Sequence, residues 1–418
     1  MRIIYKIGIR VYFLLVILAS PFNQKAARWL RGRRGMWKRL KQGIQSEKDL
    51  YWFHCSSLGE FEQGRTVIEG FREKNPDAFI LLTFFSPSGY ELRKNYQVAD
   101  LVSYLPLDTR FNAWRFINLV KPRAAYFIKY EFWYYFLRTL KKKHIPVYLV
   151  SAKFRRDQVF FRWYGAWYRK FLRFFEYFFV QDKDSADLLM ENGFQNVVVS
   201  GDTRFDRVYG IAKNSREYPG IELFRQDKKV MVAGSIWEKD EEIIIKFINE
   251  CTEDYKFILA PHEISSKKIY RLVSEIEGLV VRFTDEDKTF FPRARVLLID
   301  TIGHLSSVYK YGEVAYIGGG FGKGIHNILE AATYGLPVIF GPNYNKFREA
   351  NDLISLGAAF SIEDHKGFEK IFEELFNGRS LHYTASEVAR NYVESKLGAT
   401  EMVLRMTMDH DKVGKSEK

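Results

Sequence analysis

The sequence predicts an α/β protein with two doubly wound halves, each a parallel sheet with helices on both faces. The prediction rests first on an alternation, because short apolar runs take turns with longer helical patterns from residue 50 onward. The same alternation starts again after residues 209–227, which indicates a second half. The length of 418 residues agrees, since a single hydrophobic core rarely grows beyond roughly 250–300 residues.

In the first half, the expected strands cover residues 50–56, 78–84, 101–105, 124–129, 147–151 and 177–181. The expected helices of this half cover residues 59–74, 88–96, 112–120, 132–142 and 161–174. Strands that alternate with helices in this way form a parallel sheet. We therefore expect ligands beyond the carboxyl ends of these strands, where open parallel sheets bind them.

In the second half, the expected strands cover residues 229–234, 255–260, 279–282, 295–298, 314–318 and 337–340, with helices over 238–251, 265–276 and 327–334. We expect a segment over 1–45, Rossmann-like domains over 46–210 and 228–380, a C-terminal helix over 381–410 and a frayed polar tail. Two doubly wound domains that face a cleft are the plan of GT-B glycosyltransferases, which this organisation resembles.

The N-terminal segment predicts a membrane-associated helix. Residues 7–19 are mostly apolar, and the basic residues between 25 and 41 follow with no acidic residue before Glu47. The apolar run is shorter than the roughly 18–20 residues of a confident spanning helix, so an interfacial helix with a basic flank explains it at least as well. The positive flank favours a cytoplasmic main body. An ordinary amphipathic first helix is the alternative.

The composition limits the classes of molecule that we expect this protein to bind. A formal net charge of +13 favours anionic partners, which are nucleic acid, anionic lipid or phosphorylated substrates. The sequence has no zinc-ligand spacing, RNA-recognition signature or helix-turn-helix pattern, so we expect no nucleic-acid partner. Two distant cysteines, Cys55 and Cys251, indicate a reducing compartment rather than a disulfide framework.

One candidate catalytic residue follows the first expected strand. Glu60 ends the segment 56–60 and opens a helix at the mouth of the sheet, where a carboxylate can accept a proton from a bound hydroxyl. Acidic residues are also favoured in the first turn of any helix, so helix capping is the alternative.

A glycine-rich loop over residues 318–324 is the second candidate site. Backbone amides of such a loop can approach a phosphate, and the helix expected after it adds a positive dipole end. Glu330, one turn into that helix, is placed to hold ribose hydroxyls. The spacing matches neither a Walker loop nor a dinucleotide fingerprint, and glycines also serve plain turns.

Three further segments carry polar or aromatic groups after strands. Residues 129–133 contain Glu131, and Pro261 and His262 follow another strand. Arg204 can stabilise negative charge on a leaving phosphate, although an ion pair with Asp202 or Asp206 explains it equally well. The basic, aromatic stretch 153–173 can meet lipid phosphates, or it is a helix with a solvated basic face.

Taken in order, these segments resemble the transferases of 3-deoxy-D-manno-octulosonic acid (Kdo) in lipopolysaccharide biosynthesis. The resemblance covers nearly the whole chain, and it lies in the order and spacing of its motifs rather than in any single one. The motifs occupy residues 57–60, 106–108, 130–133, 150–153, 201–206, 300–303, 318–319, 326–330 and 340–342.

The resemblance implies an inverting transfer of Kdo from CMP-Kdo to the lipid A precursor lipid IVA, at the cytoplasmic face of a bacterial inner membrane and without metal or cofactor. It implies that Glu60 is the general base and that Glu131 and Arg204 assist near the transition state. It also implies the CMP-binding set, which is Pro261, His262, Ile302, Gly303, His304, Asn327, Ile328, Leu329 and Glu330.

Two residues depart from the family's pattern. Arg204 stands where the family usually has lysine, and the two are not equivalent at a close charge contact. His304 replaces a usual acidic residue, so its contact with the donor is less certain than that of Gly303. Two alternatives stay open: another GT-B enzyme with a different nucleotide sugar, and a membrane-bound, non-catalytic binding protein on this scaffold.

Overall fold

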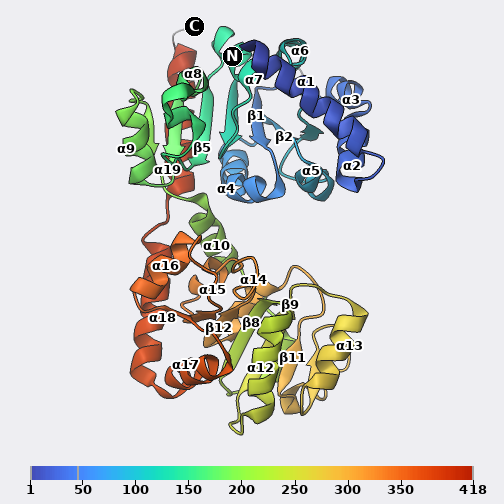
Figure 1. Ribbon diagram of the computed structural model, residues 1–418, viewed down its shortest axis with the longest axis vertical. Helices are drawn as coiled ribbons and strands as arrows, with labels where there is room; N and C mark the ends of the chain where they lie inside the picture. Colours follow the sequence, from blue (N-terminus) through green and yellow to red (C-terminus); the bar gives the residue numbers. More distant parts are fainter. Residues whose placement is uncertain (1, 45–46, 417–418) are drawn as a thin grey trace. The chain divides into compact units, whose positions relative to one another are not determined.

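The computed structural model describes residues 2–44 and 47–416 (Figure 1). Contacts divide the chain into two compact units, unit 1 with Met1–Arg207 and Leu397–Lys418, and unit 2 with Val208–Lys396. Each unit is an α/β layer structure around a parallel sheet of seven strands, which confirms the predicted fold class.

The sheet of unit 1 has the order β3-β2-β1-β4-β5-β6-β7 and is parallel throughout. Its strand order reverses between β1 and β4, which are neighbours although two other strands separate them in the sequence. Such a switch point opens a crevice at the carboxyl ends of the strands. The strands are β1 (Leu50–Cys55), β2 (Phe79–Phe84), β3 (Leu101–Tyr104), β4 (Ala124–Ile128), β5 (Val147–Ala152), β6 (Tyr177–Val180) and β7 (Val197–Val199).

Helices cover both faces of this sheet, so successive strand residues are buried on opposite sides. In β1, Trp52 packs on one face and Phe53 on the other, and the whole strand is buried. A strand that is buried on both faces is apolar throughout rather than alternating, which is why β1 and β2 are so apolar. The helices of unit 1 are α1 (Arg2–Ala19), α2 (Gln24–Arg33), α3 (Met36–Gly43), α4 (Leu58–Lys74), α5 (Pro87–Arg93), α6 (Arg110–Val120), α7 (Tyr134–Lys142), α8 (Ala166–Leu172), α9 (Lys183–Glu191) and α19 (Ala399–Ser416).

The N-terminal helices pack on unit 1 by a few aromatic side chains. On α1, the hydroxyl of Tyr5 donates to buried Asp108 (2.5 Å), which also accepts from two backbone amides at the start of α7. Tyr12 contacts Trp29 of α2 and Phe85 beyond β2. Most other apolar side chains of α1 are exposed, so the helix is only partly covered.

No single helix in the described residues is long and apolar enough to cross a membrane. The helices α1 and α2 pass that test of length and composition together, but the chain bends by 115° between them.

Unit 2 repeats the same plan with the strand order β10-β11-β9-β8-β12-β13-β14, and its switch point lies between β8 and β12. Its strands are β8 (Val230–Ile236), β9 (Lys256–Pro261), β10 (Val280–Arg282), β11 (Val296–Leu298), β12 (Val314–Ile317), β13 (Val338–Phe340) and β14 (Ala359–Ser361). Its helices are α11 (Pro219–Arg225), α12 (Glu238–Glu250), α13 (Ser266–Glu275), α14 (Leu305–Val308), α15 (Leu329–Ala332), α16 (Arg348–Ser355), α17 (His365–Asn377) and α18 (Arg379–Glu394), and α10 (Thr203–Lys213) runs from unit 1 into unit 2.

Three predicted helices differ from the observed ones. The helix expected over 161–174 is two 3-10 turns (Val159–Phe161 and Trp163–Gly165) and the short α8. The helix expected over 327–334 is the four-residue α15. The helix expected over 381–410 is divided between α18 and α19 by a break at Gly398, whose φ of +103° interrupts the helix.

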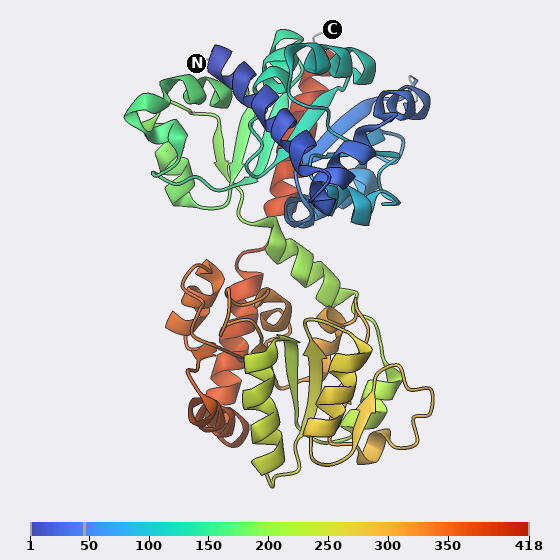
Figure 2. The same cartoon turned by 45° about the vertical axis from the view of Figure 1, so that its right-hand side comes forward.

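After that break, α19 packs on unit 1, as Figure 2 shows. Val403 and Leu404 enter the core beneath α4, and the carboxylate of Asp206 accepts the amides of Gly398 and Thr400 (both 2.7 Å). The last helix, α19, therefore belongs to unit 1, which also contains the N-terminal helices.

Candidate active site

Two glutamates meet at the switch point of unit 1. Glu60 lies in the first turn of α4, directly after β1, and Glu131 follows β4, the neighbouring strand. Their carboxyl groups lie close enough to interact electrostatically. The structure thus brings together the two residues that the sequence places 71 positions apart (131 − 60).

The Glu60 carboxyl group also caps its own helix. Its Oε2 accepts the backbone amide of Ser57 (2.9 Å), and the Ser57 hydroxyl lies 3.3 Å from the same oxygen. Burial, and then the charge of Glu131, raise the pKa of Glu60 to about 7, against the lowering effect of the Ser57 hydrogen bonds. A carboxyl group with this pKa exchanges protons near neutrality, as a general base requires. Helix capping and a catalytic role are therefore compatible in this residue.

A buried histidine that the sequence analysis missed completes this cluster. His54 is fully buried in β1, and its Nε2 atom lies 3.0 Å from Oε2 of Glu131. Its Nδ1 atom lies 2.8 Å from the Thr83 hydroxyl on β2. The indole N–H of Trp133 donates to the same oxygen of Glu131 (2.5 Å). The sequence contained one signal for this residue, a histidine among the apolar residues of a strand. Such a histidine needs hydrogen-bonding partners once it is buried.

The backbone is strained beside this cluster. Lys129 has a φ of +68° directly after β4, and Ser151 has a φ of +54° within β5. Side-chain-bearing residues rarely adopt this left-handed region, and such strain persists where the surroundings enforce it, often at functional sites. Here it turns the chain sharply two residues before Glu131.

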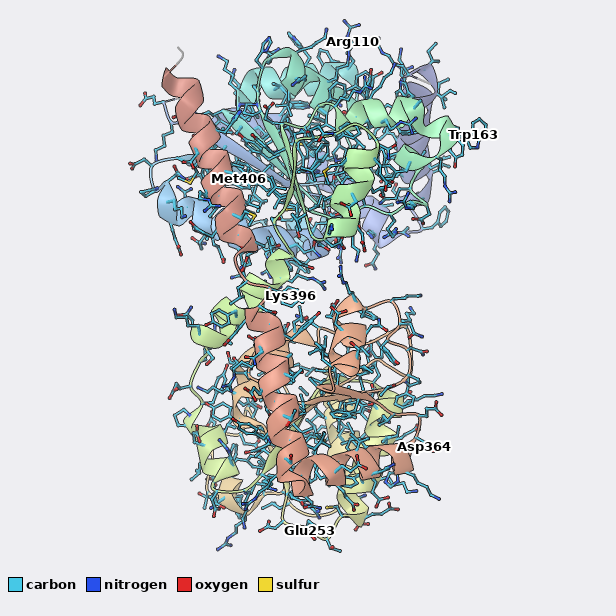
Figure 3. The ribbon with its side chains drawn as sticks, turned by 90° about the vertical axis from the view of Figure 1, so that its left-hand side faces the viewer. Arg110, Trp163, Glu253, Asp364, Lys396 and Met406 are labelled. Atoms are coloured by element: carbon cyan, nitrogen blue, oxygen red, sulfur yellow. The ribbon has the colours of Figure 1, made fainter. Side chains whose placement is uncertain are left out.

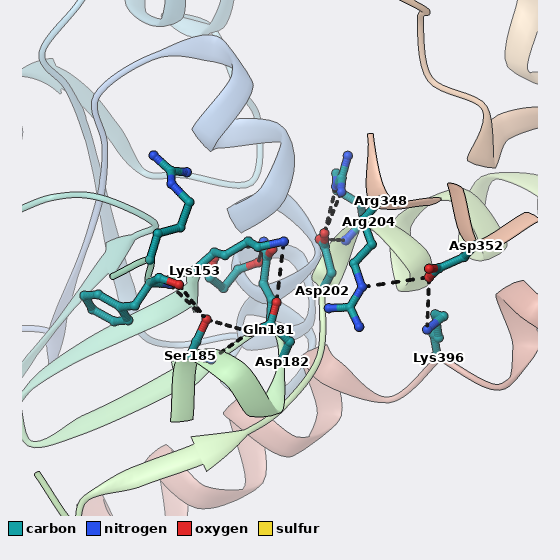
Figure 4. Close-up of polar contacts among 12 residues, drawn as sticks. Lys153, Gln181, Asp182, Ser185, Asp202, Arg204, Arg348, Asp352 and Lys396 are labelled. Carbon is teal, nitrogen blue, oxygen red and sulfur yellow. Dashed lines mark hydrogen bonds and ion pairs between the residues drawn. The ribbon is translucent and has the colours of Figure 1, made fainter. Parts of the chain in front are cut away.

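Arg204 makes the ion pair that the sequence left as an alternative. Its guanidinium lies 2.8 Å from Asp202, which is buried, and Figure 4 shows this pair together with the pair of Lys153 and Asp182 (3.5 Å). The neighbouring Thr203 contacts the Ser151 hydroxyl (3.4 Å) and donates to the Gln63 carbonyl on α4. Arg204 is therefore held beside the carboxyl edge of the sheet, already partnered by a carboxylate.

The stretch 153–173 divides its side chains between the core and solvent. Phe160 and Phe171 are buried, whereas Trp163 is 90% exposed and projects from the surface in Figure 3. Arg156 pairs with Glu191 (2.9 Å). The stretch thus has buried aromatic residues, as expected for the alternative of a helix with a solvated basic face. It also has an exposed tryptophan.

In unit 2, the glycine-rich loop follows β12 at the switch point. A Cβ atom on Gly318 would lie 2.2 Å from the carbonyl of Ser235, and one on Gly320 would lie 2.5 Å from the amide of Gly341. These two glycines are therefore required by close backbone packing. The amide of Gly319 donates to Asp240 (2.8 Å), a fully buried carboxylate that the sequence analysis missed.

The loop uses several of its amides within the protein. Those of Gly322 and Gly324 both donate to the Gly319 carbonyl, and the amide of His326 donates to the Gly318 carbonyl. The helix after the loop has only four residues. The expected phosphate cradle, formed by free loop amides and a helix dipole, is correspondingly weaker than the sequence indicated.

A stack of aromatic rings stands beside this loop. The ring of His262, after β9, stacks on Trp237, after β8, with centroids 4.2 Å apart, and lies 4.6 Å from the ring of His326. The indole N–H of Trp237 donates to Nε2 of His326 (3.0 Å). Burial, and then the charge of His262, lower the pKa of His326. The stack offers flat faces to a planar ligand, and Trp237 was not among the predicted residues.

The remaining predicted CMP-binding residues lie in three places. Asn327 donates to Glu330 (2.9 Å), and Ile328 and Leu329 beside them are buried. Ile302 is 83% exposed, and Gly303 has a φ of +91° with open space where a Cβ would lie. His304 starts α14, and its Nδ1 atom lies 2.9 Å from the hydroxyl of Tyr218. Pro261 ends β9 beside His262.

The described part of the chain contains no cluster of three or more histidine, cysteine, aspartate or glutamate side chains with the geometry of a metal site.

Comparison with known proteins identifies relatives. The sequence matches the model of the family described as 3-deoxy-D-manno-octulosonic-acid transferase (kdotransferase) over residues 29–207. It is 29% identical to the 3-deoxy-D-manno-octulosonic acid transferase of Aquifex aeolicus over 331 residues, which cover 78% of this chain and 85% of the relative. It is 24% identical to the transferase of the same name from Chlamydophila psittaci, over 77% of this chain and 76% of the relative.

Solved structures resemble the fold. The UDP-GlcNAc 2-epimerase of Neisseria meningitidis, bound to UDP-GlcNAc, has a TM-score of 0.59 at 15% identity and covers 86% of this chain and 99% of its own. A UDP-N-acetylglucosamine 2-epimerase from Listeria monocytogenes, described as putative, has the same TM-score at 13% identity and covers 87% and 97%. At these identities the likeness concerns the fold alone. The similarity therefore rests on the family match over residues 29–207 and on the transferase relatives, which extend it over 77–78% of this chain.

Proposed function

We propose that this protein transfers Kdo from CMP-Kdo to a hydroxyl group of the lipid A precursor lipid IVA, with inversion at the anomeric carbon. The family match over residues 29–207 and the transferase relatives support the Kdo transfer. The single structural observation that carries the chemistry is the pair of interacting carboxyl groups, Glu60 and Glu131, at the switch point of unit 1.

On the acceptor side, Glu60 is the general base. A sugar hydroxyl has a high pKa and needs a base at the moment of attack, and Glu60 titrates near neutrality. The hydrogen bonds from Ser57 hold Glu60 in place, and the neighbouring charge of Glu131 contributes to its raised pKa. The hydroxyl oxygen forms the new bond to the anomeric carbon of Kdo while the CMP phosphate departs, so one displacement inverts that centre.

On the donor side, CMP leaves as a stabilised phosphate monoester, so charge stabilisation matters more than protonation. We assign the nucleotide to unit 2, to the loop after β12, the pair of Asn327 and Glu330, and the segment from Ile302 to His304. Two observations support this: the loop follows β12 at the switch point, and the stack of Trp237 and His262 presents a ring face. Arg204 is the candidate to offset phosphate charge, and its bond to Asp202 must then be shared or exchanged.

We also propose that α1 lies in the surface of an anionic membrane, at the cytoplasmic face of a bacterial inner membrane. Its exposed apolar side chains include Ile3, Ile7, Leu14 and Leu18, which are 54–72% exposed. The α2 and α3 helices add a basic flank, which suits anionic headgroups.

The test is turnover of the full-length protein with CMP-Kdo and a lipid A precursor in detergent. We expect release of CMP together with a Kdo-modified lipid, and no product with UDP-GlcNAc or UDP-glucose. Product from a UDP-sugar alone would assign another donor. Failure with every donor, from a folded protein that binds CMP by calorimetry, would favour the non-catalytic binding protein.

A further inference from the structure

The buried residue His54 has no role in the chemistry above, although it lies against the second glutamate. It is fully buried in β1, and Glu131 is 4% exposed. Three polar atoms converge there: Nε2 of His54, Oε2 of Glu131 and Nε1 of Trp133, at mutual distances between 2.5 and 3.1 Å. An imidazole has no reason to be buried in a strand core unless its two nitrogens are satisfied.

The partners of His54 decide where its hydrogens lie. Its Nδ1 atom is 3.1 Å from the backbone carbonyl of Thr83, which can only accept. The Thr83 hydroxyl, 2.8 Å away, accepts the indole N–H of Trp52 (2.7 Å) and donates to the carbonyl of Phe53 (3.4 Å). A hydrogen on Nδ1 satisfies the Thr83 carbonyl and hydroxyl oxygens, and this is the tautomer that we assign from these partners.

With a hydrogen on Nδ1, the contact between His54 and Glu131 requires a second proton. The Nε2 atom of a neutral ring of this tautomer only accepts, and so does an ionised carboxylate. Two acceptors 3.0 Å apart in a buried site repel each other, whereas a proton between them makes a hydrogen bond. The indole N–H of Trp133 supplies one hydrogen and cannot fully satisfy both atoms.

We propose that His54 is a positioning residue that shares a proton with Glu131, and that it thereby removes the negative charge which would otherwise keep Glu60 protonated. The step is a balanced proton shift: the proton lies on Nε2 of His54 or on Oε2 of Glu131, and the pair is neutral overall in either case. Glu60 can then ionise beside a neutral group and accept the proton of the acceptor hydroxyl. The inference rests on the proposed role of Glu60 as a base.

The surroundings contain few other charges that could replace this effect. Among the described residues, Glu60 and His54 interact with Glu131, and the buried Cys55 thiol interacts with Glu60, Glu131 and Glu62. Glu62 is itself paired with Arg93 (2.9 Å) and Arg207 (2.7 Å). Burial raises the pKa of the Cys55 thiol, so it stays neutral. His54 is therefore the group that directly contacts Glu131 and can carry a positive charge.

The test compares His54→Gln and His54→Asn with the wild type. Glutamine can keep a hydrogen bond toward Glu131, and asparagine can keep one toward Thr83, but neither carries the proton. The readout is the titration of Glu60 in protein labelled with ¹³C on glutamate carboxyls, assigned by the signal that Glu60→Gln removes. We expect both variants to raise the titration midpoint of Glu60 by about one pH unit, the size of effect that a neighbouring charge produces. The acid limb of kcat/KM should move upward with it.

The control is the same pair of substitutions in a Glu131→Gln background. Glu131→Gln alone should leave the midpoint close to that of the wild type, because the pair of His54 and Glu131 is already neutral, and a His54 substitution should then have no further effect. A shift that persists in this background, or no shift in either folded His54 variant, would overturn the proposal. Two His54 variants are used so that the test remains possible if one of them does not fold, and melting curves show whether each variant is folded. The titration does not depend on turnover. An inactive wild type would therefore refute the proposed function, whereas the titration would still decide whether His54 shares a proton with Glu131.

Discussion

At the scale of single residues, Glu60 combines two properties that the sequence offered as alternatives. Its carboxylate completes a capping box with Ser57, which fixes the side chain at the mouth of the sheet. Burial, and then the charge of Glu131, raise its pKa to about 7. The capping hydrogen bonds therefore also position the base, because a side chain held by two hydrogen bonds is conformationally restricted before substrate binds.

The substitution Glu60→Gln separates the two properties. Glutamine also serves in a capping box, so we expect little change in the melting temperature, whereas transfer should fall by roughly 10²-fold or more with the base removed. Initial rates beside melting curves measure both quantities. Turnover close to that of the wild type would leave capping as the role of Glu60.

The same pKa predicts a pH dependence. Below pH 7 Glu60 gains a proton and cannot act as a base, so kcat/KM should fall about tenfold for each pH unit below about 7 and level off above it. The residual activity of Glu60→Gln should lack this acid limb. The same limb in both proteins would assign it to another group.

At the scale of elements, the loop after β12 is shaped by backbone packing. Gly318 lies against the carbonyl of Ser235, itself in a left-handed conformation with a φ of +54°. Asp240, at the start of α12, accepts the amides of Trp237 and Gly319 and the hydroxyl of Tyr316 (each 2.8 Å). Glycine and aspartate together hold the loops after β8 and β12 in contact.

A matched pair of alanine substitutions tests this account of the loop. Gly318→Ala should lower the free energy of unfolding by about 1–3 kcal/mol, because its Cβ would overlap backbone atoms that cannot move aside. Gly322→Ala should be nearly neutral, since the nearest atom to the new Cβ, the carbonyl oxygen of Gly319, would lie 3.6 Å away. Thermal or denaturant unfolding compares them, and equal costs would contradict close packing as the reason for Gly318.

The pair of Asn327 and Glu330 allows a binding test in the same region. Glu330→Ala should weaken the binding of CMP by about 10- to 100-fold, as expected when a charged hydrogen-bonding group is lost, with little effect on acceptor binding. Calorimetry with CMP measures it, and Glu373→Ala, an exposed acid on α17, is the control. Unchanged affinity in Glu330→Ala would place the nucleotide elsewhere.

At the scale of the whole molecule, the N-terminal helices pack against the rest of unit 1, in addition to the membrane contact proposed for α1. Arg33 was expected to join a basic flank, but its guanidinium lies 3.6 Å from the ring centroid of Trp29 and donates to the carbonyls of Phe85 (2.8 Å) and Leu105 (3.2 Å). Burial lowers its pKa to about 9. Removing residues 1–20 would therefore also remove Tyr5 from Asp108 and Tyr12 from Phe85.

A milder change isolates the membrane role. Leu14→Glu with Leu18→Glu alters exposed side chains of α1 and leaves Tyr5 and Tyr12 in place. We expect this double variant to float poorly with anionic liposomes, with residual binding that high salt removes, and to keep its activity on acceptor dispersed in detergent. Leu223→Glu, an exposed leucine of unit 2, should float normally. If the double variant floats as well as the wild type, α1 is not the main anchor.

The sequence by itself determined the two parallel α/β halves and the positions of Glu60 and Glu131, because apolar periodicity and residues after strands are local patterns. It could not determine the partners of these residues, since strand order, and with it the meeting of β1 and β4, depends on contacts far apart along the chain. His54 illustrates the difference. In the sequence it is one polar residue in an apolar strand, and only the neighbouring strands supply Thr83 and Glu131. Helix lengths after the glycine loop and around Gly398 were also decided in three dimensions, where backbone packing and a left-handed glycine outweighed local propensity.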